Sequence, residues 1–288
     1  MSVGANRRIV LVSCEDQPGI VWKVTGFMHE RGGNIEELEQ HVDGDSGHFF
    51  MRVEVEFPTG ANDEALQGEF NTQLAEPLSL SWRWHNSTNH QRLAVFVSKE
   101  SHCLLDILAR TQAGEWPAEV AVVVSNHEHW LDQMRAYGVA CVHVPVVKGQ
   151  LEPALSQHRQ ILHEHRIDCV VLARYMQLIP APLLQEWQWR MINIHHSFLP
   201  AFEGARPYHN AHQRGVKLVG ATAHYVTDVL DQGPIIAQSV VPVRHTDSVE
   251  DLKRKGRDIE KTVLARAIWH QLRRDILVHQ GRTIVFGE

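Results

Sequence analysis

Apolar residues in the first part of the chain switch between helical and extended spacing. Helical spacing predicts one helix over residues 20–31 and a second over 64–74. Extended runs rich in β-branched residues predict four strands, at 8–13, 34–41, 48–57 and 78–85. The order strand, helix, strand, strand, helix, strand is that of a ferredoxin-like sandwich. The N-terminal part is therefore expected to form a small βαββαβ domain.

From residue 92 the pattern changes to continuous apolar runs that alternate with helical segments. Four buried strands are predicted, at 93–97, 120–124, 142–146 and 169–173. Helices are expected at 126–137, where Ser125 and Glu128 resemble a capping box, and at 152–165. Strands that are apolar on both faces and alternate with helices are typical of a mostly parallel, doubly wound sheet. The fold class expected is α/β.

The C-terminal third continues this sheet. Strands are predicted at 219–226 and 235–243, antiparallel at an edge, before a long helix that begins near Ser248 and a hairpin around residues 280–282. The polar run 87–91 contains no apolar residue and is interpreted as a linker. The predicted domains are therefore 1–86 and 92–288, and 288 residues with 43% hydrophobic content suffice for two unequal cores.

Charge and hydropathy exclude several function classes. The net charge is −6 and the basic residues are scattered, which argues against nucleic acid as a partner. No apolar run approaches the roughly 20 residues that span a bilayer, and the N-terminus has no apolar leader. The sequence therefore favours a cytoplasmic protein that does not contact membranes.

The cysteines and histidines do not predict a metal site. The cysteines lie far apart without a CxxC pair and are expected to be reduced core thiols: Cys14, Cys103, Cys141 and Cys169. Among the 20 histidines, the close pairs are two residues apart on predicted helices and should face different sides: His127 with His129, and His163 with His165. No metal and no other cofactor is expected.

Three polar residues carry the candidate chemistry. Asn193 and His195 lie two apart in an extended segment, so their side chains should share one face. An amide N–H can donate to an oxygen that becomes negative, and an imidazole can transfer protons at neutral pH. Asp231, in a turn-rich loop, can orient the histidine or take a proton from water. Taken singly, the three would be a turn residue, a buried histidine and a solvated acid.

The spacing around these residues resembles a known family. Asn193-x-His195-x-Ser-x-Leu-Pro, followed by Leu230-Asp231-x-Gly-Pro-Ile, is similar to the signature of formyltransferases that use 10-formyltetrahydrofolate, over residues 90–286. The resemblance implies that Asn193, His195 and Asp231 are catalytic, with His224 and His196 beside them. It also implies that two segments hold the folate: Tyr175, Met176, Gln177, Leu178 and Ile179 in one, and Thr227, Asp228, Val229 and Leu230 in the other.

The N-terminal domain resembles an ACT domain, a small regulatory module that commonly binds amino acids. The resemblance depends on the turn from Asp16 to Ile20 between the first strand and helix. It implies an effector site that includes Asp16, Gly19 and Ile20, with glycine or methionine as ligands to test. As plain turn chemistry, Pro18 presets φ and Gly19 accepts a positive φ. A role in homo-oligomer formation is also expected, because the edges of such small sheets pair readily.

Three features favour the hydrolytic, deformylating branch of the family. The loop 98–104 contains no glycine to cradle a phosphorylated acceptor, and Glu100 beside Lys99 would repel a phosphate. His196 stands where transformylases often have proline, and the resemblance links an ACT domain to hydrolysis. The expected reaction converts 10-formyltetrahydrofolate to formate and tetrahydrofolate, which supplies formate for purine synthesis and balances one-carbon folate pools.

Two alternatives stay open at this point. A transferase that formylates an unphosphorylated amine would keep the same catalytic residues and differ only in the acceptor pocket. An amino-acid-binding regulatory protein with a degenerate enzyme domain is the other alternative, and the intact Asn193, His195 and Asp231 argue against it.

Overall fold

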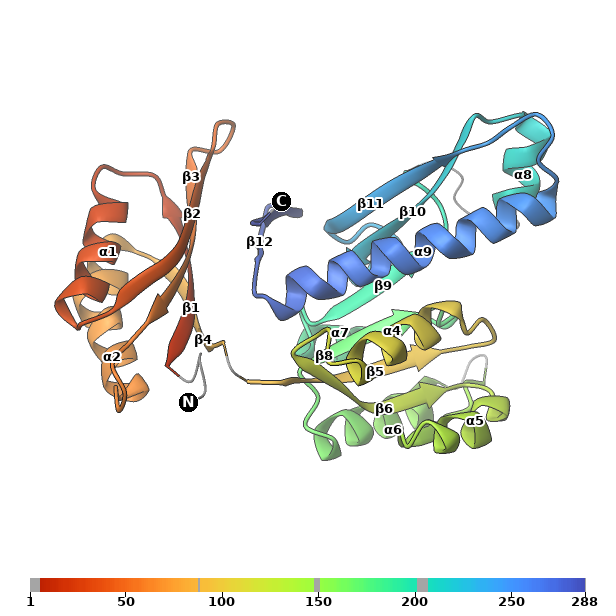
Figure 1. Cartoon of the computed structure of the whole chain (residues 1–288), viewed down its shortest axis with the longest axis horizontal. Helices are drawn as coiled ribbons and strands as arrows, with labels where there is room; N and C mark the ends of the chain where they lie inside the picture. The colour runs from red at the N-terminus through yellow and green to blue at the C-terminus, as the bar shows by residue number, and fades with distance from the viewer. Residues whose placement is uncertain (1–5, 88, 148–150, 201–206, 288) are drawn as a thin grey trace. The chain divides into compact units, whose positions relative to one another are not determined.

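A computed structural model of the whole chain describes residues 6–87, 89–147, 151–200 and 207–287 (Figure 1). The chain divides into two compact units. Unit 1 comprises the chain up to residue 89 together with 273–277 and 284–288, and unit 2 comprises 90–272 and 278–283. The C-terminal residues thus depart from the predicted division, in which everything after residue 91 belonged to one domain. Of the predicted linker, residue 88 lies outside the described residues.

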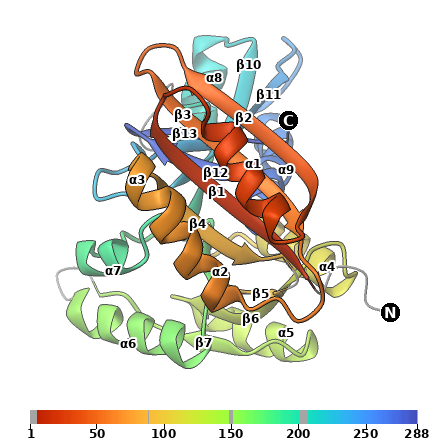
Figure 2. The same cartoon turned by 90° about the vertical axis from the view of Figure 1, so that its left-hand side faces the viewer.

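Unit 1 is an antiparallel sheet covered on one face by helices, as predicted. Its strands have the order β2-β3-β1-β4. The elements follow the βαββαβ pattern: β1 Arg7–Glu15, α1 Ile20–Glu30, β2 Asn34–Asp43, β3 His48–Glu56, α2 Asp63–Phe70 and β4 Ser81–Asn86. In Figure 2 the helices α1, α2 and the short α3 (Glu76–Leu78) lie in front of this sheet.

The second helical segment of unit 1 is less regular than the predicted helix over 64–74. Helix α2 ends at Phe70, a wide π turn follows over Asn71–Ala75, and α3 ends at Leu78, after which Ser79 has a left-handed φ of 54°. Pro77 explains part of this irregularity, because proline cannot donate the backbone hydrogen bond that an α-helix requires. The last strand therefore begins at Ser81, three residues later than predicted.

Both faces of the unit 1 sheet are buried. Val10 and Val12 face the helices α1 and α2, and the alternate residue Leu11 faces the opposite side. There Leu11 packs with Phe50 and with apolar residues of the C-terminal segment, Leu277 and Phe286. This packing explains why β1 is a continuous run of apolar residues. In antiparallel sheets with one solvated face, apolar and polar residues usually alternate along each strand.

Unit 2 is a seven-stranded sheet with the order β11-β10-β9-β8-β5-β6-β7. Strands β5 to β9 are parallel, and β10 is antiparallel to both of its neighbours. The mostly parallel sheet with an antiparallel edge is therefore confirmed. The strands are β5 Gln91–Val97, β6 Ala118–Ser125, β7 Cys141–His143, β8 Cys169–Ala173, β9 Met191–His195, β10 Leu218–Tyr225 and β11 Ile235–Pro242.

Helices cover both faces of this sheet (Figure 1). Helices α6 (Leu151–Glu164) and α7 (Ala181–Glu186) pack with the face that carries Ala94 and Phe96. Helix α9 (Val249–Leu272) lies along β9, β10 and β11 and packs against α4 (His102–Gln112). The remaining helices are α5 Leu131–Ala136 and α8 Pro207–Arg214, and β12 Ile276–His279 pairs with β13 Arg282–Val285 in a hairpin.

Two details of unit 2 differ from the prediction. The Ser125 hydroxyl accepts a hydrogen bond from the His127 backbone N–H at 3.0 Å, and the chain then forms a short 3₁₀ turn, so α5 begins only at Leu131 and the capping box was wrong. Strand β7 has three residues rather than five. No helix within the described ranges has the length and hydropathy needed to cross a bilayer.

The carboxyl ends of the central strands bring several loops together. Ser98, directly after β5, accepts a hydrogen bond on its hydroxyl from the Met176 backbone N–H at 3.0 Å. Its own hydroxyl donates to Asn126 Oδ1 at 2.7 Å, and its carbonyl accepts from the Trp130 indole. The loops after β5, β6 and β8 are therefore tied at one edge of the sheet, beside the end of β9, which is where ligands bind in open α/β sheets.

Candidate active site

Strand β9 carries two of the predicted residues. Asn193 and His195 alternate with buried apolar residues, so both side chains lie on the same face near the carboxyl end of the strand. His195 is 8% exposed, and its Nε2 atom has no hydrogen-bond partner among the described residues. The ring thus has one nitrogen available for a reacting group.

His224 lies opposite Asn193 on the neighbouring strand β10, within the antiparallel register. Its Nδ1 is 2.9 Å from the Tyr225 carbonyl oxygen, and a carbonyl can only accept, so this nitrogen carries the proton. In the neutral ring Nε2 is then an acceptor, and it lies 3.2 Å from Asn193 Nδ2. His224 therefore fixes the orientation of the Asn193 amide and leaves one further amide N–H for a ligand.

Asp231 reaches the same place from the loop between β10 and β11. Its Oδ1 is 3.2 Å from His195 Nδ1 and 3.7 Å from His224 Nε2. The hydrogen bond from His195, and secondarily the nearby His224 ring, lower the pKa of Asp231 well below its ordinary value. The structure thus brings Asn193, His195, His224 and Asp231 together, with an ionised carboxylate at their centre.

The loop that presents Asp231 depends on two backbone features. Asp231 itself has a left-handed φ of 56°, a conformation that aspartate adopts more readily than most residues. Gly233 passes so close to β10 that a Cβ atom there would lie 1.7 Å from the Tyr225 carbonyl oxygen. Only glycine therefore allows the loop to turn back over His195.

Replacing Gly233 with alanine should displace the loop and lower kcat by about 10²-fold, the loss typical of a misplacement near 1 Å. Steady-state kinetics would measure the effect. Gly68→Ala is the matched control, since a Cβ there meets nothing within 4 Å and the residue lies in helix α2 of unit 1. Full activity of Gly233→Ala would show that the loop tolerates a side chain at this position.

His196 lies between His195 and a second buried polar cluster. Its ring centroid is 5.1 Å from that of His195 and 6.3 Å from that of Tyr208. Burial, together with the cation of Arg174, lowers the pKa of His196 to about 4, so its ring is neutral at neutral pH. His196 thus contributes a neutral, packed ring next to His195.

The cluster centres on Glu260 of α9, which is 2% exposed. Its carboxylate accepts from the Tyr208 hydroxyl at 2.9 Å and lies 2.8 Å from His102 Nε2 and 3.6 Å from Arg174 Nε. Pattern reasoning missed these residues because they are far apart in the chain. One signal was available: Gly256 lies inside the long helix, and a Cβ there would be 1.9 Å from the Tyr208 hydroxyl oxygen.

This cluster also contains a metal-like set of donors within the described residues, namely His102, Cys103 and Glu260. The residues do not fit a resident metal. Glu260 is already compensated by Tyr208, His102 and the Arg174 cation. Burial and the Glu260 charge raise the pKa of the Cys103 thiol well above its ordinary value, whereas a metal ligand must be a thiolate.

The structure also bears on the predictions about the histidine pairs and the cysteines. The rings of His127 and His129 lie 5.9 Å apart, so the expectation that they face different sides was wrong; His127 is in an extended conformation rather than a helix. His163 pairs with Glu186 of α7. The four cysteines form no disulfide, and three are buried while Cys141 is half-buried.

The two predicted folate segments differ in how their side chains lie. The side chains of Tyr175 and Ile179 belong to the apolar core of unit 2. Met176 and Leu178 are 61% and 65% exposed, and Gln177 is half-buried between them. In the second segment Thr227 donates to the Val229 carbonyl at 3.1 Å, while the side chains of Asp228, Val229 and Leu230 are exposed.

The predicted effector residues occupy the turn before α1 in unit 1. Gly19 has a φ of 91°, which favours glycine, and its carbonyl accepts from the Lys23 N–H as the helix begins. The Asp16 N–H donates to the Gly47 carbonyl at 2.9 Å, and its side chain is exposed. Ile20 is 2% exposed, and its side chain lies in the apolar core of unit 1.

Comparison with known proteins adds family information to this geometry. The formyl transferase family matches residues 91–268, and the ACT domain matches residues 8–69. A formyltetrahydrofolate deformylase of Synechocystis sp. is 46% identical over 96% of this chain and 98% of its own length. Both resemblances inferred from the sequence are therefore confirmed.

Solved structures separate two groups of relatives. The crystal structure of a formyltetrahydrofolate deformylase from Pseudomonas syringae superposes with a TM-score of 0.94 at 44% identity, and covers 98% of this chain and 94% of its own. A glycinamide ribonucleotide transformylase from Symbiobacterium toebii reaches a TM-score of 0.65 at 32% identity and covers 69% of this chain and 95% of its own. The similarity to the first group thus extends over nearly the whole chain.

Proposed function

This chain belongs to the formyltetrahydrofolate deformylases, and we propose that it hydrolyses 10-formyltetrahydrofolate with Asn193, His195 and Asp231 as its catalytic residues. The observation that carries the assignment is the similarity to deformylases over both units, since transformylases match about two thirds of the chain. The contact between His195 and Asp231 beside Asn193 supplies the chemistry. Folate is the substrate and not a resident cofactor.

Water activation depends on Asp231 and His195. The ionised Asp231 carboxylate accepts a hydrogen bond from His195 Nδ1, which holds the imidazole in one orientation and stabilises its protonated form. Asp231, helped by His195, positions a water and removes its proton as the oxygen attacks the formyl carbon. Because the pKa of Asp231 is low and His195 Nδ1 already donates to it, the proton of the water comes to rest on His195 Nε2, which has no partner among the described residues, and not on the carboxylate.

The formyl oxygen becomes negative as the tetrahedral intermediate forms. The Asn193 amide, whose orientation His224 fixes at 3.2 Å, donates its second N–H to this oxygen, and protonated His195 supplies the other donor. The C–N bond then breaks, N10 of the folate leaves with a proton from His195, and formate and tetrahydrofolate are released. Water takes the place that an amine occupies in a transformylase.

Replacing Asn193 with alanine should lower kcat by about 10²- to 10³-fold, the loss that follows removal of one oxyanion donor. KM should change far less, because this hydrogen bond strengthens mainly in the transition state. Asn193→Asp, which keeps the shape but removes the N–H, should be similarly impaired. A loss below tenfold in both variants would assign Asn193 a structural role at its contact with His224.

Substrate binding and regulation complete the proposal. The exposed Met176, Gln177 and Leu178 and the loop 227–230 flank the pterin, with backbone groups providing the hydrogen bonds. Unit 1 binds an amino-acid effector, glycine or methionine, through the backbone of the turn at Asp16 and Gly19, and it pairs subunits in a homo-oligomer. The formate released supplies purine synthesis and the reaction balances one-carbon folate pools.

Direct product analysis tests the function. Purified protein is incubated with 10-formyltetrahydrofolate in metal-free buffer without any amine, and formate and tetrahydrofolate are followed together. Equal amounts of both products are expected, with none in His195→Ala. A formylated product that forms only after amines are added, without formate in their absence, would instead assign the chain to the transferase branch and contradict the proposal.

A further inference from the structure

Arg174 has a strained backbone beside the active site. It follows β8 directly, and β8 pairs in parallel with β9, with Leu172 opposite Asn193. The residue therefore leaves the sheet beside His195, at the edge where ligands bind in open α/β sheets. Its φ of 62° lies in the left-handed region, which residues other than glycine, asparagine and aspartate seldom adopt. Strain of this kind is usually retained where it serves a function.

The Arg174 side chain is as unusual as its backbone. It is 16% exposed, and its Nε lies 3.6 Å from Glu260 Oε2, beyond the ordinary length of a hydrogen bond. Both Nε and Nη1 are buried without a hydrogen-bond partner among the described residues. Buried donors left unpaired cost free energy, so their position calls for an explanation beyond the packing of the chain.

Glu260 supplies the charge that holds the guanidinium in place. Its carboxylate accepts from the Tyr208 hydroxyl at 2.9 Å and lies 2.8 Å from His102 Nε2. Burial opposes ionisation, yet the hydrogen bond from His102 and the charge of Arg174 lower the pKa of Glu260, so the carboxylate is ionised at neutral pH. An arginine keeps its charge at any physiological pH. Arg174 thus provides a permanent cation that compensates a buried acid.

This cluster reaches the active site through His196. The His196 ring centroid lies 6.3 Å from that of Tyr208 and 5.1 Å from that of His195. Tyr208 in turn fills the space next to α9, because a Cβ atom on Gly256 would lie 1.9 Å from its hydroxyl oxygen. A continuous set of packed side chains therefore joins Glu260 to the catalytic histidine.

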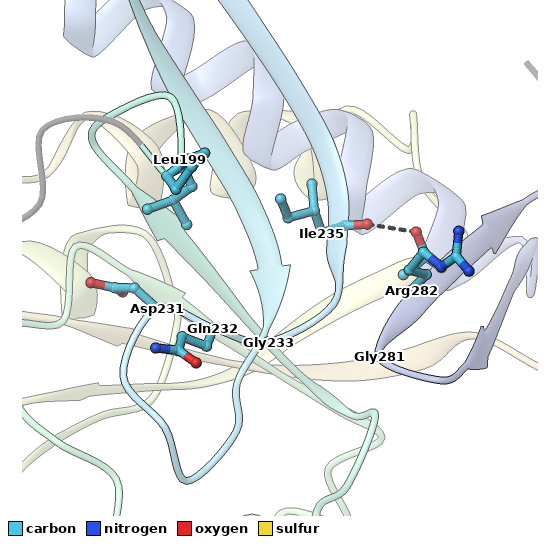
Figure 3. Close-up of a pocket in the computed structure, with 9 residues that line it drawn as sticks. Leu199, Asp231, Gln232, Gly233, Ile235, Gly281 and Arg282 are labelled. Atoms are coloured by element: carbon cyan, nitrogen blue, oxygen red, sulfur yellow. Dashed lines mark hydrogen bonds between the residues drawn. The ribbon is translucent and has the colours of Figure 1, made fainter.

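The cluster is distinct from the open space of the site. A cavity of about 550 Å³ lies beside Asp231 (Figure 3). Leu199 and the hairpin tip at 281–283 are among the residues that line it. None of the described residues that line this cavity belongs to the cluster around Glu260. The role of Arg174 must therefore be sought on the side of His196.

Charge distinguishes the possible acceptors of the formyl group. An alkyl amine has an ordinary pKa of roughly 10, so it arrives as an ammonium group that has no lone pair to accept a hydrogen bond. A buried carboxylate without a counter-charge would bind this group and could take its proton. The Arg174 cation already fills that role at Glu260 and repels a second cation. A water oxygen, in contrast, can accept from Nε and Nη1.

We propose that Arg174 selects water over amines as the acceptor of the formyl group, by compensating Glu260 and by offering Nε and Nη1 to a water oxygen; the inference rests on the proposed function. Without this cation Glu260 becomes a binding site for an ammonium group beside His195. The ammonium gives one proton to Glu260, and its nitrogen bonds to the formyl carbon as the bond to N10 breaks. A second proton of the amine passes through His195 to N10.

The test measures how the formyl group partitions between water and an amine. Each protein is incubated with 10-formyltetrahydrofolate and increasing glycinamide, and formate, N-formylglycinamide and tetrahydrofolate are quantified. Arg174→Asn removes the cation while asparagine tolerates the left-handed φ. We expect it to form about 10- to 100-fold more N-formylglycinamide than wild type, because the buried Glu260 charge loses its cation. Arg166→Asn is the matched control, since Arg166 also has a left-handed φ, of 48°, but is exposed; its partition should equal that of wild type.

Further variants separate acceptor selection from a general loosening of the site. Arg174→Lys keeps the cation and should release formate with little formylated amine. Adding Glu260→Gln to Arg174→Asn removes the charge that attracts the ammonium, so the formylated amine should fall back to the wild-type level. Formylation that persists in this double variant would refute the inference.

Two other outcomes would also contradict the role of Arg174. One is formate release without formylated amine in Arg174→Asn at every glycinamide concentration. The other is loss of all tetrahydrofolate formation both in Arg174→Asn and in Arg174→Gly, whose backbone is unstrained at this φ, since Arg174 would then be needed for the reaction itself. Absence of formate release from the wild type would instead refute the proposed function.

Discussion

We expect Asp231→Asn to lower kcat by about 10³- to 10⁴-fold and to change KM by less than about fivefold. The substitution keeps the shape of the side chain, so the loop held by Gly233 should not move. It removes the charge that Oδ1 presents to His195 Nδ1 at 3.2 Å. A neutral amide can neither pass on a proton nor stabilise the imidazolium, and a comparable change in a serine protease triad costs about 10⁴-fold.

The measurement is steady-state kinetics with 10-formyltetrahydrofolate across pH. The control is Asp258→Asn, which removes an exposed carboxylate of α9 in the same unit. The hydrogen bond from His195, together with the nearby His224 ring, lowers the pKa of Asp231, so the carboxylate should stay ionised in the wild type well into the acid range. The acid limb of the wild-type profile should therefore not report protonation of Asp231. A loss of less than tenfold in Asp231→Asn would exclude this residue as an essential participant.

Local patterns together with the family resemblance predicted which residues meet in this site. Asn193 and His195 lie on one face because successive strand side chains point to opposite faces. Their spacing of two residues is enough to predict this. Asp231 was placed in a loop because Asp, Gln, Gly and Pro cluster between two apolar strands. The parallel strands and the antiparallel edge follow from the same contrast between continuous and turn-bounded apolar runs.

The orientation of these residues could not be predicted in the same way. His224 meets Asn193 because β10 pairs with β9 in one antiparallel register, which is a property of the assembled sheet. The proximity of Glu260 to Tyr208 and His102 depends on how α9 packs against α4 and α8. Such contacts join residues that are separated by 52 and 158 positions, over which periodicity carries no information.

Exposure was hardest to predict in segments without regular structure. Tyr175 and Ile179 lie in the apolar core. The residues between them show neither the strand nor the helix spacing of apolar positions, so the sequence does not indicate which side chains are buried. The C-terminal segment was assigned to the second domain by its position in the chain. Leu277 and Phe286 are buried instead against Leu11 and Phe50 of unit 1, and only tertiary packing reveals this.

Arg52 is the clearest case of a tertiary contact that sequence patterns conceal. It lies in the middle of β3, is 1% exposed, and is surrounded by carboxylates of unit 1. Its Nη1 donates to Glu37 at 2.7 Å, its Nη2 donates to Glu54 at 3.1 Å, and its Nε is 3.0 Å from Asp275, which is also buried. Arg52 further donates to the Arg273 carbonyl at 3.2 Å. The guanidinium thus ties the C-terminal segment to the sheet.

Replacing Arg52 with methionine should lower the free energy of unfolding of unit 1 by about 3 to 5 kcal/mol, because the buried Asp275 charge loses its closest buried cation. Native-state hydrogen exchange of the β1 and β3 amides would measure the change without requiring the whole chain to unfold in one step. Arg135→Met is the control, since its pair with Asp132 is 75% and 93% exposed and should contribute less than about 1 kcal/mol.

The double variant Arg52→Met with Asp275→Leu tests whether the stability lost in Arg52→Met comes from leaving the buried Asp275 charge without its partner. Replacing both charges with apolar groups removes the desolvation penalty together with the attraction, so most of the stability lost in Arg52→Met should return. Recovery would mean that Asp275, rather than lost packing of the arginine stem, is responsible for the loss. No recovery would show that Glu37 and Glu54 dominate the interaction and that the C-terminal segment is held mainly by Leu277 and Phe286.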